Sequence, residues 1–72
     1  MKDNLITIGN NIKKYRTIAK ISQKQLADKI GVSHFWICKL EKGKRNTTIN
    51  LLILISECLN VELSQLTENS LA

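Results

Sequence analysis

The sequence predicts an all-α fold, a single compact domain of five short helices over residues 1–72. Three observations predict it. The chain has no proline and only three glycines, apolar residues recur at helical spacing in each segment, and residues that cap or end helices stand between the segments. A domain of this size buries a modest core, so a partner that covers further apolar surface would add to its stability.

The first helix is expected to continue through about residue 18. It has one apolar stripe, formed by Leu5, Ile8, Ile12, Tyr15 and Ala19. This single stripe predicts a helix that packs on the rest of the domain with one face.

A second helix is expected over residues 23–30. Ser22 and Gln25 have the spacing of a capping box, which marks a helix start. Ala27 is small enough for another helix to cross it closely, and Gly31 can adopt the positive φ that ends a helix and turns the chain.

A third helix is expected over residues 34–41, after the N-cap residue Ser33 and before Gly43. Ile37 and Leu40 recur at helical spacing and would anchor it in the core. The residues left facing outward are His34, Phe35, Trp36, Cys38 and Lys39. Two short helices around a tight turn form a helix-turn-helix, whose second helix lies in the major groove of DNA.

Two further helices follow an exposed basic loop. Thr47 or Thr48 would cap the fourth helix, which runs to about Leu59, and Asn60 is a plausible left-handed stop. The fifth helix covers roughly Leu63 to Glu68.

The charge of the chain is concentrated in its first part. Residues 1–45 hold all 11 Lys and Arg and 3 acidic residues, giving +8, whereas residues 46–72 hold 3 acidic residues, giving −3. A basic half that contains a helix-turn-helix predicts binding to nucleic acid. Membrane binding is the weaker interpretation, because the first helix shows no exposed aromatic edge.

The remaining sequence features favour a soluble, cytoplasmic protein without a signal peptide or membrane span. The longest apolar run, Leu51 to Ile55, is too short to cross a bilayer. Both cysteines are expected as reduced thiols, with Cys38 near DNA and Cys58 buried or at a dimer seam. A redox switch at Cys38 remains a less favoured hypothesis.

The expected fourth helix has two apolar faces, because eight of the eleven residues from Ile49 to Leu59 are apolar. A helical wheel places one set of residues toward the core: Ile49, Leu52, Ile53, Ser56 and Leu59. The nearly opposite set is Leu51, Leu54 and Cys58. In one interpretation the last helix, with Leu63, Leu66 and Leu71, folds back over this second face. The favoured interpretation is a homodimer interface formed by Leu51, Leu54, Cys58 and Leu66.

With these motifs the chain resembles the Cro and repressor type of helix-turn-helix proteins, also called the xenobiotic-response-element-like family. The resemblance covers nearly the whole chain, and together its motifs are a strong signal. They are Ile8-Gly9, Ile12 and Arg16, the stretch ISQKQLADKIGVS, the pattern of Ile37, Leu40, Glu41 and Gly43, and the stretches KRN and LNV. The resemblance implies a lambda-repressor-like fold. Proteins of this small size look like phage or plasmid repressors and the controller proteins of restriction-modification systems.

The resemblance also implies roles for individual residues. Gln23 would bind a DNA phosphate. The residues that would face base edges or nearby backbone are Ser33, His34, Phe35 and Lys39, and those that would contact flanking phosphates are Lys44, Arg45 and Asn46. Arg16 and Glu41 would form an internal ion pair that ties the first helix to the end of the third.

Some of these side chains have an alternative interpretation. Lys39 is favoured as a contact to guanine or phosphate over a merely solvated side chain, and Phe35 is equally compatible with a thymine methyl contact and with local packing. Trp36 is expected first to pack, with its ring on the side of the first helix and its indole N–H free to reach a DNA phosphate.

No metal site, cofactor or catalytic centre is expected. His34 and Cys38 stand four residues apart, but the chain has no other histidine and a tetrahedral site needs four ligands. The carboxylates are scattered, and no phosphate loop or nucleophile motif is present.

The sequence therefore predicts a sequence-specific, homodimeric transcriptional regulator that is not an enzyme. Its operator would be roughly palindromic, with half-sites about 34 Å apart, and autoregulation fits its size. The alternative is a protein-interaction module, such as an antitoxin or anti-repressor, that binds a second protein through the apolar face of the fourth helix.

Overall fold

The computed structural model of the protein describes residues 2–68. It contains five helices, which are α1 (Lys2–Ile18), α2 (Gln23–Ile30), α3 (His34–Glu41), α4 (Ile49–Leu59) and α5 (Leu63–Thr67). No strand forms in residues 2–68, so the predicted all-α fold of five helices is confirmed. None of the described helices is both long enough and apolar enough to span a bilayer.

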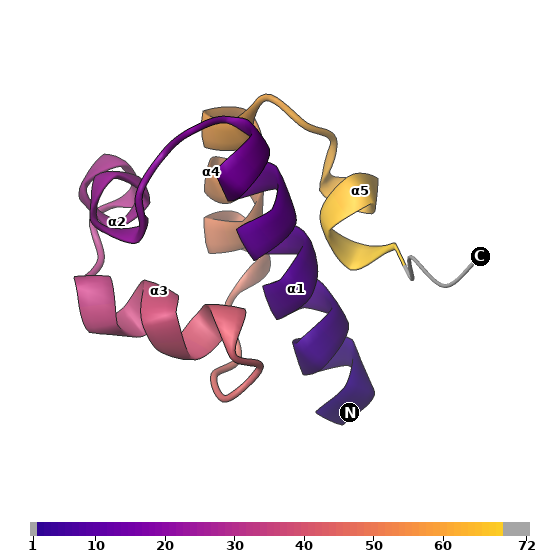
Figure 1. Cartoon of the computed structure of the whole chain (residues 1–72). Helices are drawn as coiled ribbons and strands as arrows, with labels where there is room; N and C mark the ends of the chain where they lie inside the picture. The colour runs from indigo at the N-terminus through magenta and orange to yellow at the C-terminus, as the bar shows by residue number, and fades with distance from the viewer. Residues whose placement is uncertain (1, 69–72) are drawn as a thin grey trace.

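The long helix α1 lies in the middle of the molecule (Figure 1). Helices α2 and α3 pack on each other to one side of it, and α5 lies on the opposite side. Helix α4 contacts α2, α5 and α1. The core between these helices consists of Ile12, Leu26, Ala27, Ile37, Leu40, Leu52, Ile55, Leu59 and Leu66.

The predicted helix starts around the turn are confirmed. The backbone N–H of Gln25 donates to Ser22 Oγ at 3.0 Å, and the Ser22 N–H donates to Gln25 Oε1 at 2.8 Å, which completes the capping box. Gly31 ends α2 at φ 79°, and Ser33 caps α3 by accepting from the Trp36 N–H at 3.1 Å. These local bonds fix the angle between α2 and α3.

The helix ends outside the turn also follow the predicted pattern. Of the two threonines, Thr48 is the cap of α4, and its Oγ1 accepts from the Leu51 N–H at 3.2 Å. Asn60 ends α4 in the left-handed conformation at φ 58°. Ala19 departs from the expected stripe, because α1 ends at Ile18 and Ala19 is exposed in the following turn.

Helix α1 crosses the end of α3 at Gly9, which is buried. A Cβ atom built on Gly9 would lie 2.8 Å from the Glu41 carbonyl oxygen and closer still to the Leu40 carbonyl oxygen. Real Cβ atoms do not come so near to backbone. The missing side chain of Gly9 therefore sets how closely α1 and α3 approach.

The rotation of α4 about its own axis differs from the expected one. Ile49 and Ile53 are 57% and 39% exposed rather than in the core, and Ile55 is fully buried. The residues that α4 buries are Leu52, Ile55, Ser56 and Leu59. In a helix so rich in apolar residues more than one stripe is possible, and packing against α2 and α5 selects the observed one.

The placement of Leu66 in a dimer interface is wrong, because Leu66 is fully buried in the core of this chain. Helix α5 folds back against α1 and α4, but it does not cover the face on which Leu54 stands, because Leu54 is 44% exposed. Leu63 packs on the same core, and Leu71 lies outside the described residues.

A buried amide attaches α5 to α1. The Asn11 side chain is 4% exposed, and its Nδ2 donates to the Leu66 carbonyl at 2.9 Å and to the Glu68 carbonyl at 2.8 Å. Both acceptors are backbone atoms at the end of the last helix, where carbonyls lack partners inside the helix. Sequence spacing gave no signal for this contact.

Asn11→Ala is expected to lower the free energy of unfolding by about 1 to 2 kcal/mol, because the Leu66 carbonyl loses a donor and stays buried. Urea denaturation followed by circular dichroism measures the change. Asn10→Ala, at the exposed neighbouring position, is the matched control and should stay within about 0.5 kcal/mol of the parent. Equal stability of the Asn11 variant and the parent would contradict the attachment.

Candidate nucleic-acid interface

Helix α3 is held by its inner face. Ile37 and Leu40 are buried, and the Ser33 cap fixes where the helix begins. The opposite face is therefore outward, with His34, Phe35 and Lys39 exposed. Phe35 is 77% exposed, an unusual position for a large aromatic ring without a partner.

The loop after α3 extends this face with basic residues. Lys44, Arg45 and Asn46 are all exposed. The Asn46 Oδ1 accepts from the Thr47 N–H at 2.9 Å, which holds the loop in a local turn. The predicted α3 residues and loop residues thus come from adjacent segments of the chain.

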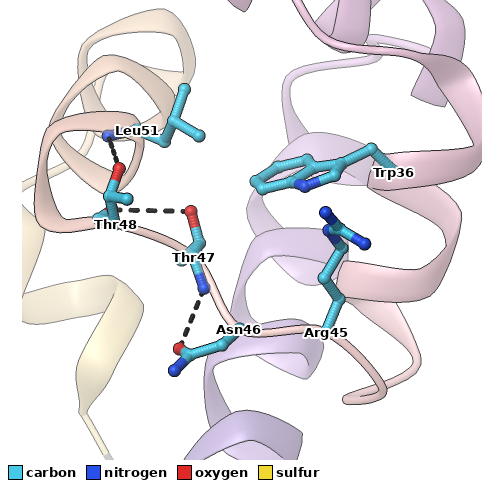
Figure 2. A pocket seen from close by; sticks show the side chains of 6 residues that line it. All are labelled: Trp36, Arg45, Asn46, Thr47, Thr48 and Leu51. Atoms are coloured by element: carbon cyan, nitrogen blue, oxygen red, sulfur yellow. Dashed lines mark hydrogen bonds between the residues drawn. The ribbon is translucent and has the colours of Figure 1, made fainter.

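Trp36 lies between α3 and the start of α4 (Figure 2). Its half-buried ring packs against the core, as expected first, and the Arg45 guanidinium lies 5.8 Å from the ring centroid. The ring lines a hollow of about 300 Å³ together with Arg45, Asn46, Thr47, Thr48 and Leu51. On the side of this hollow its neighbours are the loop and the first turn of α4.

A chain of polar contacts joins the last turn of α1, the start of α2 and both ends of α3. Arg16 Nε donates to Glu41 Oε2 at 2.6 Å, and Arg16 Nη2 donates to Glu41 Oε1 at 3.2 Å. Gln23 Nε2 donates to the same Glu41 Oε1 at 2.9 Å, and Gln23 Oε1 lies 3.0 Å from His34 Nε2. Arg16 Nη1 also donates to the Ile21 carbonyl at 2.8 Å. We call Arg16, Glu41, Gln23 and His34 the polar relay.

The relay adds a second role to Gln23. One N–H of its amide donates to Glu41 and its Oε1 faces His34 Nε2, while the second N–H of the NH₂ group leaves the predicted phosphate contact open. Gln23 and Glu41 are 18 positions apart, and only the fold brings them together. No periodicity in the sequence signals this pairing.

The residues expected at a dimer interface do not form one exposed surface. Leu54 is 44% exposed, whereas Leu51 is half-buried beside Trp36 and Cys58 is half-buried against the core. The exposed apolar residues of α4 are Ile49, Ile53 and Leu54, which we call the α4 apolar surface. Ile49 and Ile53 were not expected on this surface, because the predicted rotation of the fourth helix places both in the core.

Other candidate groups stay apart. In residues 2–68 no three side chains of His, Cys, Asp or Glu are arranged to hold a metal ion. Cys38 is half-buried. Redox control through this thiol stays a prediction, which equal DNA binding by diamide-treated and reduced protein would contradict.

Comparison with known proteins identifies the family. Residues 12–66 match the sequence model of the helix-turn-helix family. The chain belongs to the helix-turn-helix family. The Cro and repressor type resemblance is thereby confirmed.

This helix-turn-helix chain is similar to control protein C.SmaI of Serratia marcescens, with 34% identity over 59 residues that cover 82% of this chain and 70% of that protein. The restriction-modification controller protein C.AhdI from Aeromonas hydrophila has a similar structure, with a TM-score of 0.83, 25% identity, and coverage of 89% of this chain and 97% of that one.

The biofilm regulator SinR is a third relative. Its structure in complex with DNA has a TM-score of 0.76 and 33% identity, and covers 82% of this chain and 95% of that one. A SinR and SinI protein complex gives a TM-score of 0.81 at 31% identity, over 89% of this chain and 63% of that one. The helix-turn-helix chain is thus a DNA-binding transcription regulator related to restriction-modification controllers and repressors.

Proposed function

We propose that this helix-turn-helix chain is a cytoplasmic, homodimeric regulator that binds a roughly palindromic operator and controls its own gene. It is not expected to be an enzyme. The observation that carries the proposal is the outward face of α3, where a ring that is 77% exposed stands between His34 and Lys39 on a capped helix. SinR, a relative, has a structure in complex with DNA.

The exposed residues divide by the kind of DNA contact that they would make. His34 and Phe35, in the first turn of α3, would reach base edges, and a thymine methyl is the natural apolar partner of Phe35. Lys44, Arg45 and Asn46 would bind flanking phosphates, which fix register without carrying sequence information. Gln23 would bind a phosphate through its second amide N–H and would also hold His34 in place.

The test is binding to the DNA just upstream of the chain's own gene, against scrambled DNA, over a salt series. Footprinted binding that outlasts scrambled-DNA binding as salt rises supports a specific autoregulator and yields the half-site spacing. Equal, salt-labile binding to both DNAs would contradict specific recognition.

Lys39→Ala is expected to weaken operator binding about tenfold, because an exposed ammonium on the outward face loses its guanine or phosphate partner. Fluorescence anisotropy with labelled operator measures the affinity. Lys13→Ala removes the same charge from an exposed position on α1 and serves as the control. If both variants bind the operator with equal affinity, Lys39 does not contact DNA.

The proposed dimer would use the α4 apolar surface. Two copies joined by a twofold axis would cover Ile49, Ile53 and Leu54 and would present two α3 helices to successive major grooves. Exposed apolar residues grouped on one helix are typical of an interaction surface.

Leu54→Asp is therefore expected to yield monomers with weakened operator binding, because a carboxylate would have to be buried without a partner. Sedimentation velocity measures the oligomeric state. Ile18→Asp places the same charge at an exposed apolar position on α1 and should leave the dimer intact. If the Leu54→Asp variant is still a dimer, the interface lies on another surface of the chain.

The second candidate is a complex with another protein through the same surface. The relative SinR is found in a complex with the SinI protein. In the present chain the α4 apolar surface would bind the apolar face of a helix from the partner protein. Monomeric parent protein in sedimentation would favour this function over self-association.

A further inference from the structure

The polar relay fixes where the proton of His34 lies. The Glu41 carboxylate can only accept hydrogen bonds, so the Gln23 group that faces it at 2.9 Å is the amide NH₂. The other end of the Gln23 amide, Oε1, is then also an acceptor. Because this oxygen lies 3.0 Å from His34 Nε2, the imidazole must carry its proton on Nε2.

A second consequence concerns the other ring nitrogen. A neutral imidazole with its proton on Nε2 has a lone pair on Nδ1, which makes Nδ1 an acceptor. Among the hydrogen bonds of residues 2–68, none uses His34 Nδ1. The ring is exposed at the first position of α3 and stacks on Phe35, with ring centroids 6.1 Å apart at an interplanar angle of 27°. Gln23 and Phe35 thus both hold the ring.

We propose that His34 is a specificity-determining residue whose Nδ1 accepts a hydrogen bond from the exocyclic amino group of adenine or cytosine. In the major groove these amino groups are the base donors, whereas guanine offers only the acceptors N7 and O6. The lone pair of Nδ1 repels those acceptors. Gln23 is a positioning residue, and the proposal rests on the proposed function.

The proton position is tested on the free protein by ¹⁵N NMR of the imidazole at alkaline pH. His34 is the only histidine of the chain, so its signals need no further assignment. The parent is expected to show the Nε2–H form alone, with slowed exchange of that proton. In Gln23→Met, which keeps the length of the side chain without its amide, the Nδ1–H form is expected to appear and exchange to accelerate.

Lys24→Met, at an exposed position of the same helix, is the matched control and should retain the parent spectrum. A predominant Nδ1–H form in the parent, or a Gln23→Met spectrum identical to that of the parent, would overturn the relay.

Base reading is tested with operators in which one base at a time lacks a single group. Purine in place of adenine, or 2-pyrimidinone in place of cytosine, removes the exocyclic amine. At the one operator position that His34 reads, this replacement is expected to weaken binding of the parent about tenfold. The same replacement should not weaken binding of His34→Ala. 7-Deazaguanine, which lacks the N7 acceptor, is expected to leave the His34-dependent affinity unchanged.

A His34-dependent loss with 7-deazaguanine would overturn the proposal, because His34 would then be a donor. Failure to bind any DNA specifically would refute the proposed function and base reading with it. The NMR result on the free protein would still decide whether the relay sets the proton position.

Discussion

Arg16→Met is expected to lower the free energy of unfolding by about 3 to 5 kcal/mol. The Glu41 side chain is 3% exposed, and its carboxylate is bonded by the Arg16 guanidinium through both oxygens. Without the guanidinium a buried charge would keep only the Gln23 amide as a partner. The Ile21 carbonyl would lose its donor as well. Urea denaturation followed by the fluorescence of Trp36, the only tryptophan, measures the loss.

A second substitution, at Glu41, distinguishes the cost of the unpaired charge from the cost of lost packing. In the double variant Arg16→Met with Glu41→Leu no charge remains buried, so much of the stability is expected to return. Lys13→Met, an exposed position on α1, is the control for a lost cation and should change stability by less than about 0.5 kcal/mol. The single variant Glu41→Leu completes the comparison. If the double variant loses as much unfolding free energy as Arg16→Met and Glu41→Leu lose together, this account is contradicted.

Gly9→Ala is expected to lower the free energy of unfolding by about 3 kcal/mol, at the upper end of what overpacking usually causes. In an ordinary helix interior alanine is more stable than glycine by about 1 kcal/mol, so the sign is reversed here. The reason is that the new methyl group would meet the backbone carbonyls of Leu40 and Glu41, which cannot rotate away. Thermal unfolding followed by circular dichroism measures the change.

Asn10→Ala is the natural comparison for Gly9→Ala, since it introduces the same residue next to it on an exposed part of α1. That variant should be as stable as the parent or slightly more so. A Gly9→Ala variant more stable than the parent would mean that α1 and α3 lie farther apart than the structure places them.

The elements around the turn were predictable because their chemistry is local. Ser22, Gly31 and Ser33 act on residues within a few positions, through a cap or a positive φ, and the sequence alone contains that information. The resemblance to repressors then placed the expected DNA contacts on α3. Whether those residues touch DNA stays a proposal.

The orientation of α4 was not predictable in the same way. A helix with apolar residues around most of its circumference fits several rotations, and the distribution of Leu52, Ile53 and Ile55 between core and solvent depends on its neighbours. The hydrogen bond from Gln23 to Glu41 likewise requires the packing of α2 against α3. Such contacts follow from tertiary structure, which residue spacing does not encode.

The Asn11 attachment has a consequence for how the end of this domain can vary. The Asn11 amide donates to main-chain oxygens of Leu66 and Glu68, so these two hydrogen bonds require no particular side chain, and Leu66 is the buried position that packing holds fixed. The exposed positions of α5, such as Ser64 and Thr67, can therefore be substituted while the helix keeps its place. Evolution can therefore change the exposed surface of α5, and with it the partners that this surface binds, while the Asn11 hydrogen bonds are kept. The same positions are open to protein engineering.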